Sequence, residues 1–182
     1  MSWTAVIVGS FFDWAFAYPG TFGWDLPART ATIFDGGDIP YEASTVMQIG
    51  RAIAAVLSSP GNPDDFKNKY IYINSFTVTQ NQVVRELEMA TGAKFQITHQ
   101  TTEELVRYAL EKSAGGGTVR HASSGEYADG AQEAIMAVTY NYGGFNNYSK
   151  TKGLWNERLG LTEESLEETM LRVVSEQSVT TK

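Results

Sequence analysis

The chain has 182 residues, of which 42% are hydrophobic and 19% are charged, a composition that is ordinary for one globular domain with a core of its own. Its formal net charge of −7 and its pI near 4.8 argue against nucleic-acid binding, because a phosphate-binding surface needs clustered Lys and Arg side chains. The chain contains no cysteine, which excludes disulfides and Cys-ligated metals and is compatible with a cytoplasmic location.

Membrane and metal sites are not indicated either. No apolar run approaches the roughly 18 residues of a membrane span. No Lys or Arg precedes Arg29, so the positively charged region of a secretory signal is missing. His99 and His121 are the only histidines, and neither has a partner at metal-ligand spacing. We therefore expect no metal and no contact with a membrane.

The first element is a short apolar run over residues 5–8 that ends at Gly9. Such a run predicts a strand buried on both faces of a parallel sheet. Phe11, Phe12 and Trp14 follow at its C-terminal end, which is where ligands bind in open α/β sheets. This aromatic cluster could instead be core packing, and Asp13 within it could be either a pocket carboxylate or an exposed strand end.

The next predicted elements are a flap, a helix and a strand. Residues 29–34 alternate in polarity and end in a tight-turn signal before residues 39–42, which predicts a small hairpin-like β flap. Thr45 is a candidate helix cap, and apolar residues recur at helical spacing from Val46 to Leu57. Residues 69–73 favour a buried strand.

Helices dominate the rest of the chain. Capping boxes at residues 79–82 and 101–104 predict two helices, and residues 94–98 between them alternate as a strand. A further helix is predicted over residues 124–141, and a last helix is predicted to be capped by Thr162. No repeat or low-complexity linker divides the chain, so residues 1–182 are expected to form a single domain.

The chemistry-bearing motifs of a nicotinamide enzyme are absent or weak. No G-x-G-x-x-G follows a strand, so the dinucleotide fingerprint is missing. Two Tyr/Lys pairs have the spacing used by short-chain dehydrogenases, Tyr108 with Lys112 and Tyr148 with Lys152. With nine Tyr and seven Lys in the chain such pairs arise by chance, so we assign no catalytic residue.

The segment from Trp3 to Trp14 (WTAVIVGSFFDW) resembles the sixth strand and pocket loop of the NmrA-like and isoflavone-reductase-like proteins, atypical short-chain dehydrogenases that bind NAD(P). Later segments resemble the same family in the same order: residues 68–73, 82–92 and, as in fungal members, 155–166. The resemblance implies the C-terminal part of a Rossmann-like α/β domain, with a parallel sheet, substrate-side helices and a small β flap. The half that carries the dinucleotide fingerprint and the catalytic Lys of the family would precede it.

The resemblance also implies the site and the cofactor. It assigns NADP or NAD as cofactor, with Gly9, Ser10 and Phe11 beside it, and it assigns Phe12, Asp13 and Trp14 to a small-molecule substrate. A complete relative would transfer hydride from NAD(P)H to a small aromatic substrate. Because the fingerprint half is missing, this chain alone is expected to bind NAD(P) poorly and to be catalytically incomplete.

Other interpretations remain open at this point. Some NmrA-like proteins sense the dinucleotide and bind a regulatory protein partner without catalysis, which would also suit a chain without a convincing Tyr/Lys pair. A truncated gene model or an evolutionary fragment is a third possibility. Since the strand over residues 4–9 would lack a neighbour on one side, we also expect a homodimer through this exposed sheet edge, or poor solubility.

Overall fold

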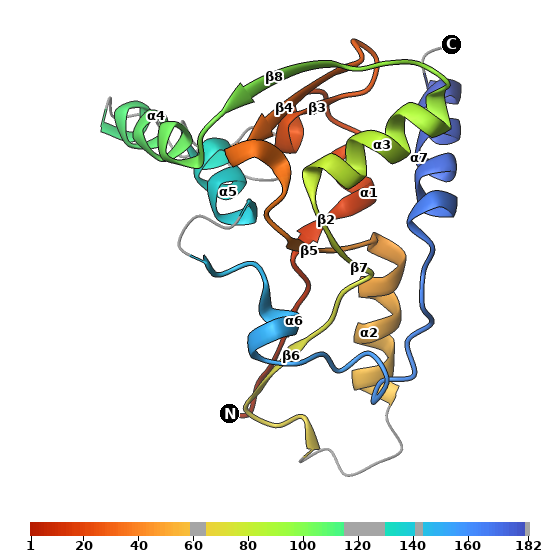
Figure 1. Ribbon diagram of the computed structural model, residues 1–182. Helices are drawn as coiled ribbons and strands as arrows, with labels where there is room; N and C mark the ends of the chain where they lie inside the picture. The colour runs from red at the N-terminus through yellow and green to blue at the C-terminus, as the bar shows by residue number, and fades with distance from the viewer. Residues whose placement is uncertain (59–64, 115–129, 141–143, 181–182) are drawn as a thin grey trace.

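The computed structural model describes residues 1–58, 65–114, 130–140 and 144–180, and it shows a mixed α/β chain (Figure 1). Strand β1 (Thr4–Ile7) pairs in parallel with β6 (Lys69–Tyr72). The continuations of these two strands, β2 (Ser10–Phe11) and β7 (Phe76–Val78), hold β5 (Tyr41–Ser44) between them. A third sheet has the order β3-β4-β8. The predicted fold class, α/β with parallel strand pairing, is confirmed.

A helix precedes the second strand of the parallel pair and packs against it. Helix α2 (Val46–Ser58) leads from β5 toward β6, and its Ala52 is completely buried. Ala52 packs with Phe66, Ile71 and Ile73 in a small core, against which Val6 is partly buried. The predicted helix and the predicted strand are therefore both present. β1 itself is only half-buried, with Thr4 exposed, because α2 covers just one face of a sheet of two strands.

Both strands of the predicted β flap are present, but they do not pair with each other as a hairpin. Strand β4 (Thr30–Phe34) pairs antiparallel with β3 (Trp24–Asp25) and parallel with β8 (Gln96–Gln100). It does not pair with β5, which belongs to the middle sheet. The turn at Asp35–Gly37 is a 3-10 turn that redirects the chain between two sheets instead of folding it back on itself.

The two capping boxes begin the helices as predicted. Thr79 accepts a hydrogen bond from the backbone N–H of Gln82 at 3.2 Å and opens α3 (Gln80–Thr91), which ends at Gly92 in the left-handed conformation. Thr101 and Glu104 form the reciprocal pair that opens α4 (Thr102–Ala114). The cap of α7 (Leu166–Thr180) is Ser165 and not Thr162, because the helix begins only at Leu166 and the Ser165 hydroxyl accepts the Glu168 N–H.

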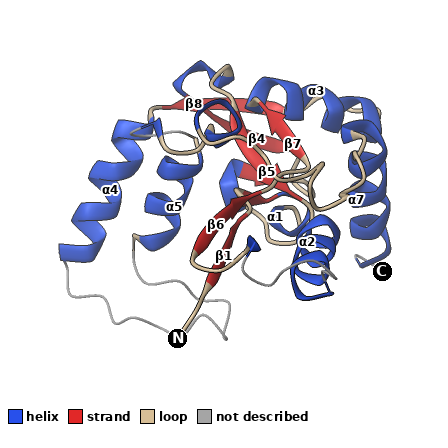
Figure 2. Cartoon of the chain, turned by 90° about the horizontal axis from the view of Figure 1, so that it is seen from below, coloured by secondary structure: helices blue, strands red, loops and turns tan. Residues whose placement is uncertain are grey.

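Two short helices lie near the β1–β6 pair. Helix α5 (Ala131–Thr139) packs against α4, and α6 (Tyr148–Thr151) lies beside β6 (Figure 1). The predicted helix over residues 124–141 is thus confirmed only from residue 131, since residues 115–129 lie outside the described part. The view from below shows α2 and α7 on one side of the strands and α4 and α5 on the other (Figure 2).

The main core is separate from the small one and is rich in aromatic side chains. Phe34 stacks on Tyr140 with ring centroids 5.2 Å apart, and Tyr41 meets the same Tyr140 edge-on. The Tyr140 hydroxyl donates to the carbonyl of Phe22. These contacts join the β4 sheet, the middle sheet and α5 into one body.

Three buried tyrosines make the fold sensitive to alkali. Burial raises the pKa of Tyr41, Tyr140 and Tyr148 above the ordinary value, and the charge of Glu42 raises that of Tyr148 further. Unfolded tyrosines ionise near pH 10, so the stability that depends on these groups is present below about pH 10 and is lost as the pH rises above it. We expect cooperative unfolding there, with tyrosinate absorbance and circular dichroism changing together. Full ionisation of all nine tyrosines with unchanged circular dichroism would contradict this assignment.

Candidate functional site

A groove of about 560 Å³ opens beside β1 and continues past its carboxyl end. One wall is β1 with the turn that follows it, and the other is formed by α5 and the segment leading into α6. Among the described residues, no charged side chain lines this groove, although the chain as a whole carries a net charge of −7. The lining residues are Val6, Ile7, Val8, Gly9, Ser10, Ala134, Ile135, Val138, Thr139, Phe145, Asn146 and Tyr148.

Gly9 lies in the turn between β1 and β2, at the carboxyl end of β1. Its φ of +66° is a left-handed conformation, which side chains other than glycine rarely adopt. A Cβ atom at this position would lie 2.6 Å from the carbonyl carbon of Glu42 and closer still to the carbonyl oxygen. Glycine therefore allows the turn between β1 and β2 to press directly against the backbone of β5.

Glu42 lies directly behind this turn and is completely buried. One carboxylate oxygen accepts hydrogen bonds from Asn74 Nδ2 at 2.7 Å and from Thr77 Oγ1 at 2.8 Å. The other accepts from the backbone N–H of Ser149 at 2.9 Å. No Lys or Arg pairs with this carboxylate within the described ranges.

The same residue also connects the groove walls through its backbone. The Glu42 N–H donates to the carbonyl of Asn146 at 3.1 Å, and its carbonyl accepts from Ser10 Oγ at 3.4 Å. Glu42 therefore joins the pocket turn, the strand β7 and the start of α6. A buried charge is costly unless it is hydrogen-bonded, and here three neutral donors supply that compensation.

Neither Tyr/Lys pair forms a catalytic dyad. Tyr148 lines the groove but is buried, and its hydroxyl donates to the backbone carbonyl of Ile73 at 2.7 Å. Its raised pKa opposes the phenolate that such a dyad would need. The Lys112 ammonium lies 4.5 Å from the centre of the Tyr108 ring and forms an ion pair with Glu133.

The structure brings two of the six predicted site residues to the groove, namely Gly9 and Ser10. Phe11 is 43% exposed on the other side of the turn. Phe12 starts α1 (Phe12–Ala15) and points into the main core, where it packs against Phe16 and Phe76. Trp14 packs on Tyr18 with centroids 4.9 Å apart. The chain turns into a helix immediately after β2, and this turn carries the aromatic side chains away from the groove.

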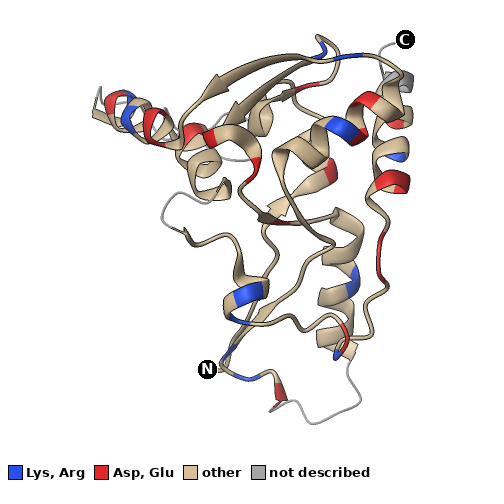
Figure 3. Ribbon diagram, viewed as in Figure 1, with Lys and Arg blue, Asp and Glu red and all other residues tan. Residues whose placement is uncertain are grey.

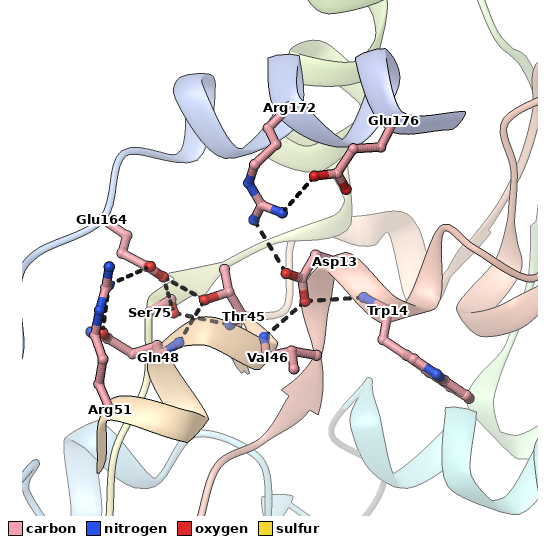
Figure 4. Close-up of polar contacts among 10 residues, drawn as sticks. All are labelled: Asp13, Trp14, Thr45, Val46, Gln48, Arg51, Ser75, Glu164, Arg172 and Glu176. Carbon is pink, nitrogen blue, oxygen red and sulfur yellow. Dashed lines mark hydrogen bonds and ion pairs between the residues drawn. The ribbon is translucent and has the colours of Figure 1, made fainter. Parts of the chain in front are cut away.

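Asp13 belongs to α1, and its carboxylate lies at the N-terminus of α2 (Figure 4). Its Oδ1 accepts hydrogen bonds from the backbone N–H of Val46 at 2.9 Å and of Trp14 at 3.1 Å. Its Oδ2 pairs with Arg172 of α7 at 3.2 Å. Asp13 thus caps one helix from outside and holds a second helix against it.

Glu164 forms the other half of this arrangement (Figure 4). Its carboxylate accepts from Thr45 Oγ1 at 2.8 Å and Ser75 Oγ at 2.6 Å, and it pairs with Arg51 at 3.0 Å. Glu163, Glu167 and Glu168 are exposed, but Glu164 ties the C-terminal segment to α2.

Replacing Asp13 tests this capping role. Asp13→Ala removes both the cap and the ion pair, and we expect it to lower the free energy of unfolding by about 1–2 kcal/mol, as for loss of a helix cap. Asp13→Asn keeps an oxygen for the Val46 N–H and should lose less. Urea unfolding of both variants measures the difference, and equal stability of Asp13→Ala and the original chain would contradict the assignment.

The described residues fit an apolar ligand better than a dinucleotide. A pyrophosphate needs backbone N–H groups at a helix N-terminus and no competing negative charge. The helix that follows Gly9 and Ser10 has only four residues and carries Asp13 in its first turn. Among the described residues, no group of three or more metal-ligating side chains could hold a metal ion. No helix in the described ranges is long and apolar enough to cross a membrane.

Comparison with known sequences identifies fungal oxidoreductases. Oxidoreductase poxI of Penicillium oxalicum is 23% identical over 142 residues, which cover 76% of this chain and 44% of that protein. Oxidoreductase aprR of Aspergillus flavus is 29% identical over 116 residues, which cover 64% of this chain and 37% of that protein. The chain therefore spans less than half the length of these curated relatives. No family model matches it.

Comparison with solved structures identifies several reductases with a similar fold. Isoflavone reductase matches with a TM-score of 0.61 at 15% identity, over 94% of this chain and 52% of that one. The binary complex of leucoanthocyanidin reductase with NADPH from Vitis vinifera matches with a TM-score of 0.65 at 13% identity, over 96% and 55%. An NADPH-dependent quinone oxidoreductase from Escherichia coli, complexed with NADPH, matches at 0.55 and 15%, over 91% and 51%. The predicted resemblance to isoflavone-reductase-like proteins is confirmed in the fold.

Proposed function

We propose that this chain is the substrate-side portion of an NAD(P)-dependent oxidoreductase. The observation that carries the proposal is the uncharged groove at the carboxyl end of β1. Ligands of open α/β sheets bind at this end, and apolar grooves with few polar groups suit small neutral ligands. The fold shared with NADPH-bound reductases and the relation to fungal oxidoreductases support the same conclusion.

The groove would take a small, neutral, aromatic substrate. Ile135 and Val138 present half-exposed apolar side chains from α5, and Phe145 is 75% exposed beside them. The Ser10 hydroxyl donates to Glu42 and can still accept a hydrogen bond from a ligand. We infer that Gly9, Ser10 and Phe11 approach the nicotinamide end of the cofactor, while its phosphates are held by a unit that the described residues do not contain.

In this arrangement the chain's own residues position and exclude water. The groove walls would remove the substrate ring from solvent, and Glu42 would fix the relative position of these walls through its three donors. The cofactor would supply the hydride when bound. The Phe12, Asp13 and Trp14 side chains would affect substrate binding only indirectly, through the core and the α2 N-terminus. A cytoplasmic location stays a prediction.

Binding of 1,4-naphthoquinone tests the proposal, and the absence of cysteine prevents its addition to a thiol. With methyl-labelled Ile and Val, we expect saturable shifts at Ile135 and Val138. Ile135→Lys should abolish binding, because the ammonium would enter the groove. Ile53→Lys is the matched control, since Ile53 on α2 is 44% exposed and Ile135 is 45% exposed. Equal binding by both variants, or shifts only outside the groove, would contradict the proposal.

A regulatory role is the second candidate, and one observation favours it. The Tyr148 hydroxyl donates to the Ile73 carbonyl, so the described residues offer no free proton donor of the Tyr/Lys type at the groove. Such a protein would bind a protein partner without catalysis. A pull-down from the native extract that recovers no stoichiometric partner would count against this role.

A further inference from the structure

Three described residues with a hydroxyl group line the groove, namely Ser10, Thr139 and Tyr148. The Ser10 hydroxyl donates to the carbonyl of Glu42 at 3.4 Å, and the Tyr148 hydroxyl donates to the carbonyl of Ile73 at 2.7 Å. Since a hydroxyl has a single hydrogen, neither group donates to a ligand without giving up its protein acceptor. Thr139 is therefore the remaining source of a hydroxyl donor.

The Thr139 hydroxyl has no hydrogen-bond partner within the described ranges, although Thr139 is only 7% exposed. A threonine in a helix often donates to the carbonyl four residues earlier, but Thr139, the last residue of α5, does not donate to Ile135. Every enclosed side-chain oxygen or nitrogen of the described residues has a partner, so a hydroxyl without one is open to the outside. Since Thr139 lines the groove, a ligand there can reach this hydroxyl.

The backbone of Thr139 is held in place by Asn146. The Asn146 side-chain amide donates to the Thr139 carbonyl at 2.7 Å, and the Asn146 carbonyl accepts from the Glu42 N–H at 3.1 Å. Asn146 and Glu42 are both buried. These bonds join the end of α5 to β5, so the hydroxyl lies on a fixed part of the groove wall. A group that is fixed before binding loses little conformational freedom when a ligand binds.

The surroundings of this hydroxyl favour a neutral acceptor over an anion. Thr139 lies at the C-terminal end of α5, where the helix dipole places partial negative charge. No Lys or Arg of the described residues lines the groove, and many charged positions lie instead on α3, α4 and α7 (Figure 3). A carboxylate would therefore meet no countercharge, whereas a ring carbonyl needs only a hydroxyl donor.

We propose that Thr139 is a specificity-determining residue of the groove, and that its hydroxyl donates to a neutral acceptor on the ligand such as a ring carbonyl. This inference rests on the proposed function, because it concerns the same groove. The apolar side chains of Ile135 and Val138 hold an aromatic ring with or without a carbonyl. The Thr139 hydroxyl distinguishes the two, and one neutral hydrogen bond changes the affinity about three- to tenfold.

Binding of 1,4-naphthoquinone and of naphthalene, followed by the methyl shifts of Ile135 and Val138, tests the proposal. The two ligands share the fused rings, and only the quinone carries carbonyls. Thr139→Val removes the hydroxyl at nearly unchanged volume. It should weaken naphthoquinone binding about three- to tenfold and leave naphthalene binding unchanged. Thr139→Ser keeps the hydroxyl and should keep the ratio of the two affinities measured for the original chain.

Thr169→Val is the matched control. Thr169 on α7 is also 7% exposed, its hydroxyl also lacks a partner within the described ranges, and it does not line the groove. Its replacement should leave both affinities unchanged. If Thr139→Val binds both ligands as the original chain does, or loses affinity for both equally, the role of Thr139 is overturned and the proposed function stands. If neither ligand binds in the groove of the original chain, both proposals are overturned.

Discussion

Gly9→Ala is expected to lower the free energy of unfolding by about 3 kcal/mol or more, one of the largest effects of any single substitution in this chain. Two costs combine at this position. The left-handed backbone disfavours any Cβ by about 1–2 kcal/mol, and the Cβ would in addition overlap the Glu42 carbonyl. Since the Cβ would overlap a backbone carbonyl, the overlap can be relieved only by moving the turn at Gly9 away from β5. The groove would then lose its floor as well.

Gly20→Ala is the matched control for Gly9→Ala. Gly20 has a φ of +81°, but a Cβ atom there would meet no other atom within 4 Å. Its replacement should therefore cost only the backbone share, about 1–2 kcal/mol. Urea unfolding measures both variants. If Gly9→Ala is as stable as Gly20→Ala, the close approach of Gly9 to the Glu42 carbonyl is contradicted.

Glu42→Ala is the second substitution with a large expected effect. It leaves Asn74, Thr77 and Ser149 with buried donors that have lost their acceptor, and each such loss costs about 1–3 kcal/mol. Removing a buried charge returns part of this cost, so we expect a net loss of about 3 kcal/mol. The free energy of unfolding of Glu42→Gln should lie between those of the original chain and of Glu42→Ala, because its amide nitrogen would face another donor on one side.

The readout for Glu42 includes the groove as well as stability. Glu42→Gln should shift the methyl resonances of Val138 and weaken naphthoquinone binding, because it weakens the side-chain hydrogen bonds that connect Glu42 to β7 and to the start of α6. Glu176→Ala, which removes an exposed i,i+4 pair with Arg172, should cost less than about 0.5 kcal/mol and leave the groove unchanged. Equal effects of Glu42→Ala and Glu176→Ala on unfolding would show that the buried network contributes nothing.

Local signals in the sequence predicted the helices of this chain well. The Thr79 and Thr101 capping boxes and the Gly92 stop act within one turn of the chain, and the structure confirms all three. Strand pairing depends on residues far apart. β4 was expected to pair with the next strand along the chain, but it pairs with β8, more than sixty residues later. The alternation of β4 was visible in the sequence, whereas the identity of its neighbour was not.

The same distinction between local signals and contacts of distant residues applies to the groove. Its position after β1 was predicted, because the strand end and Gly9 are local features. Its second wall was missed, since Ile135 and Val138 looked like one face of an ordinary helix, and no local signal distinguishes a core face from a groove wall. Glu42 was missed for a related reason. A lone carboxylate in a short segment looks exposed, and only the fold brings Asn74, Thr77 and Ser149 around it.

Calorimetric titration of the purified chain with NADPH tests the central claim most directly. If the chain supplies the substrate side of the site and no holder for the phosphates, NADPH should show no saturable binding below about 1 mM. A Kd in the low micromolar range would contradict this account, because it would require a dinucleotide site built without the glycine fingerprint.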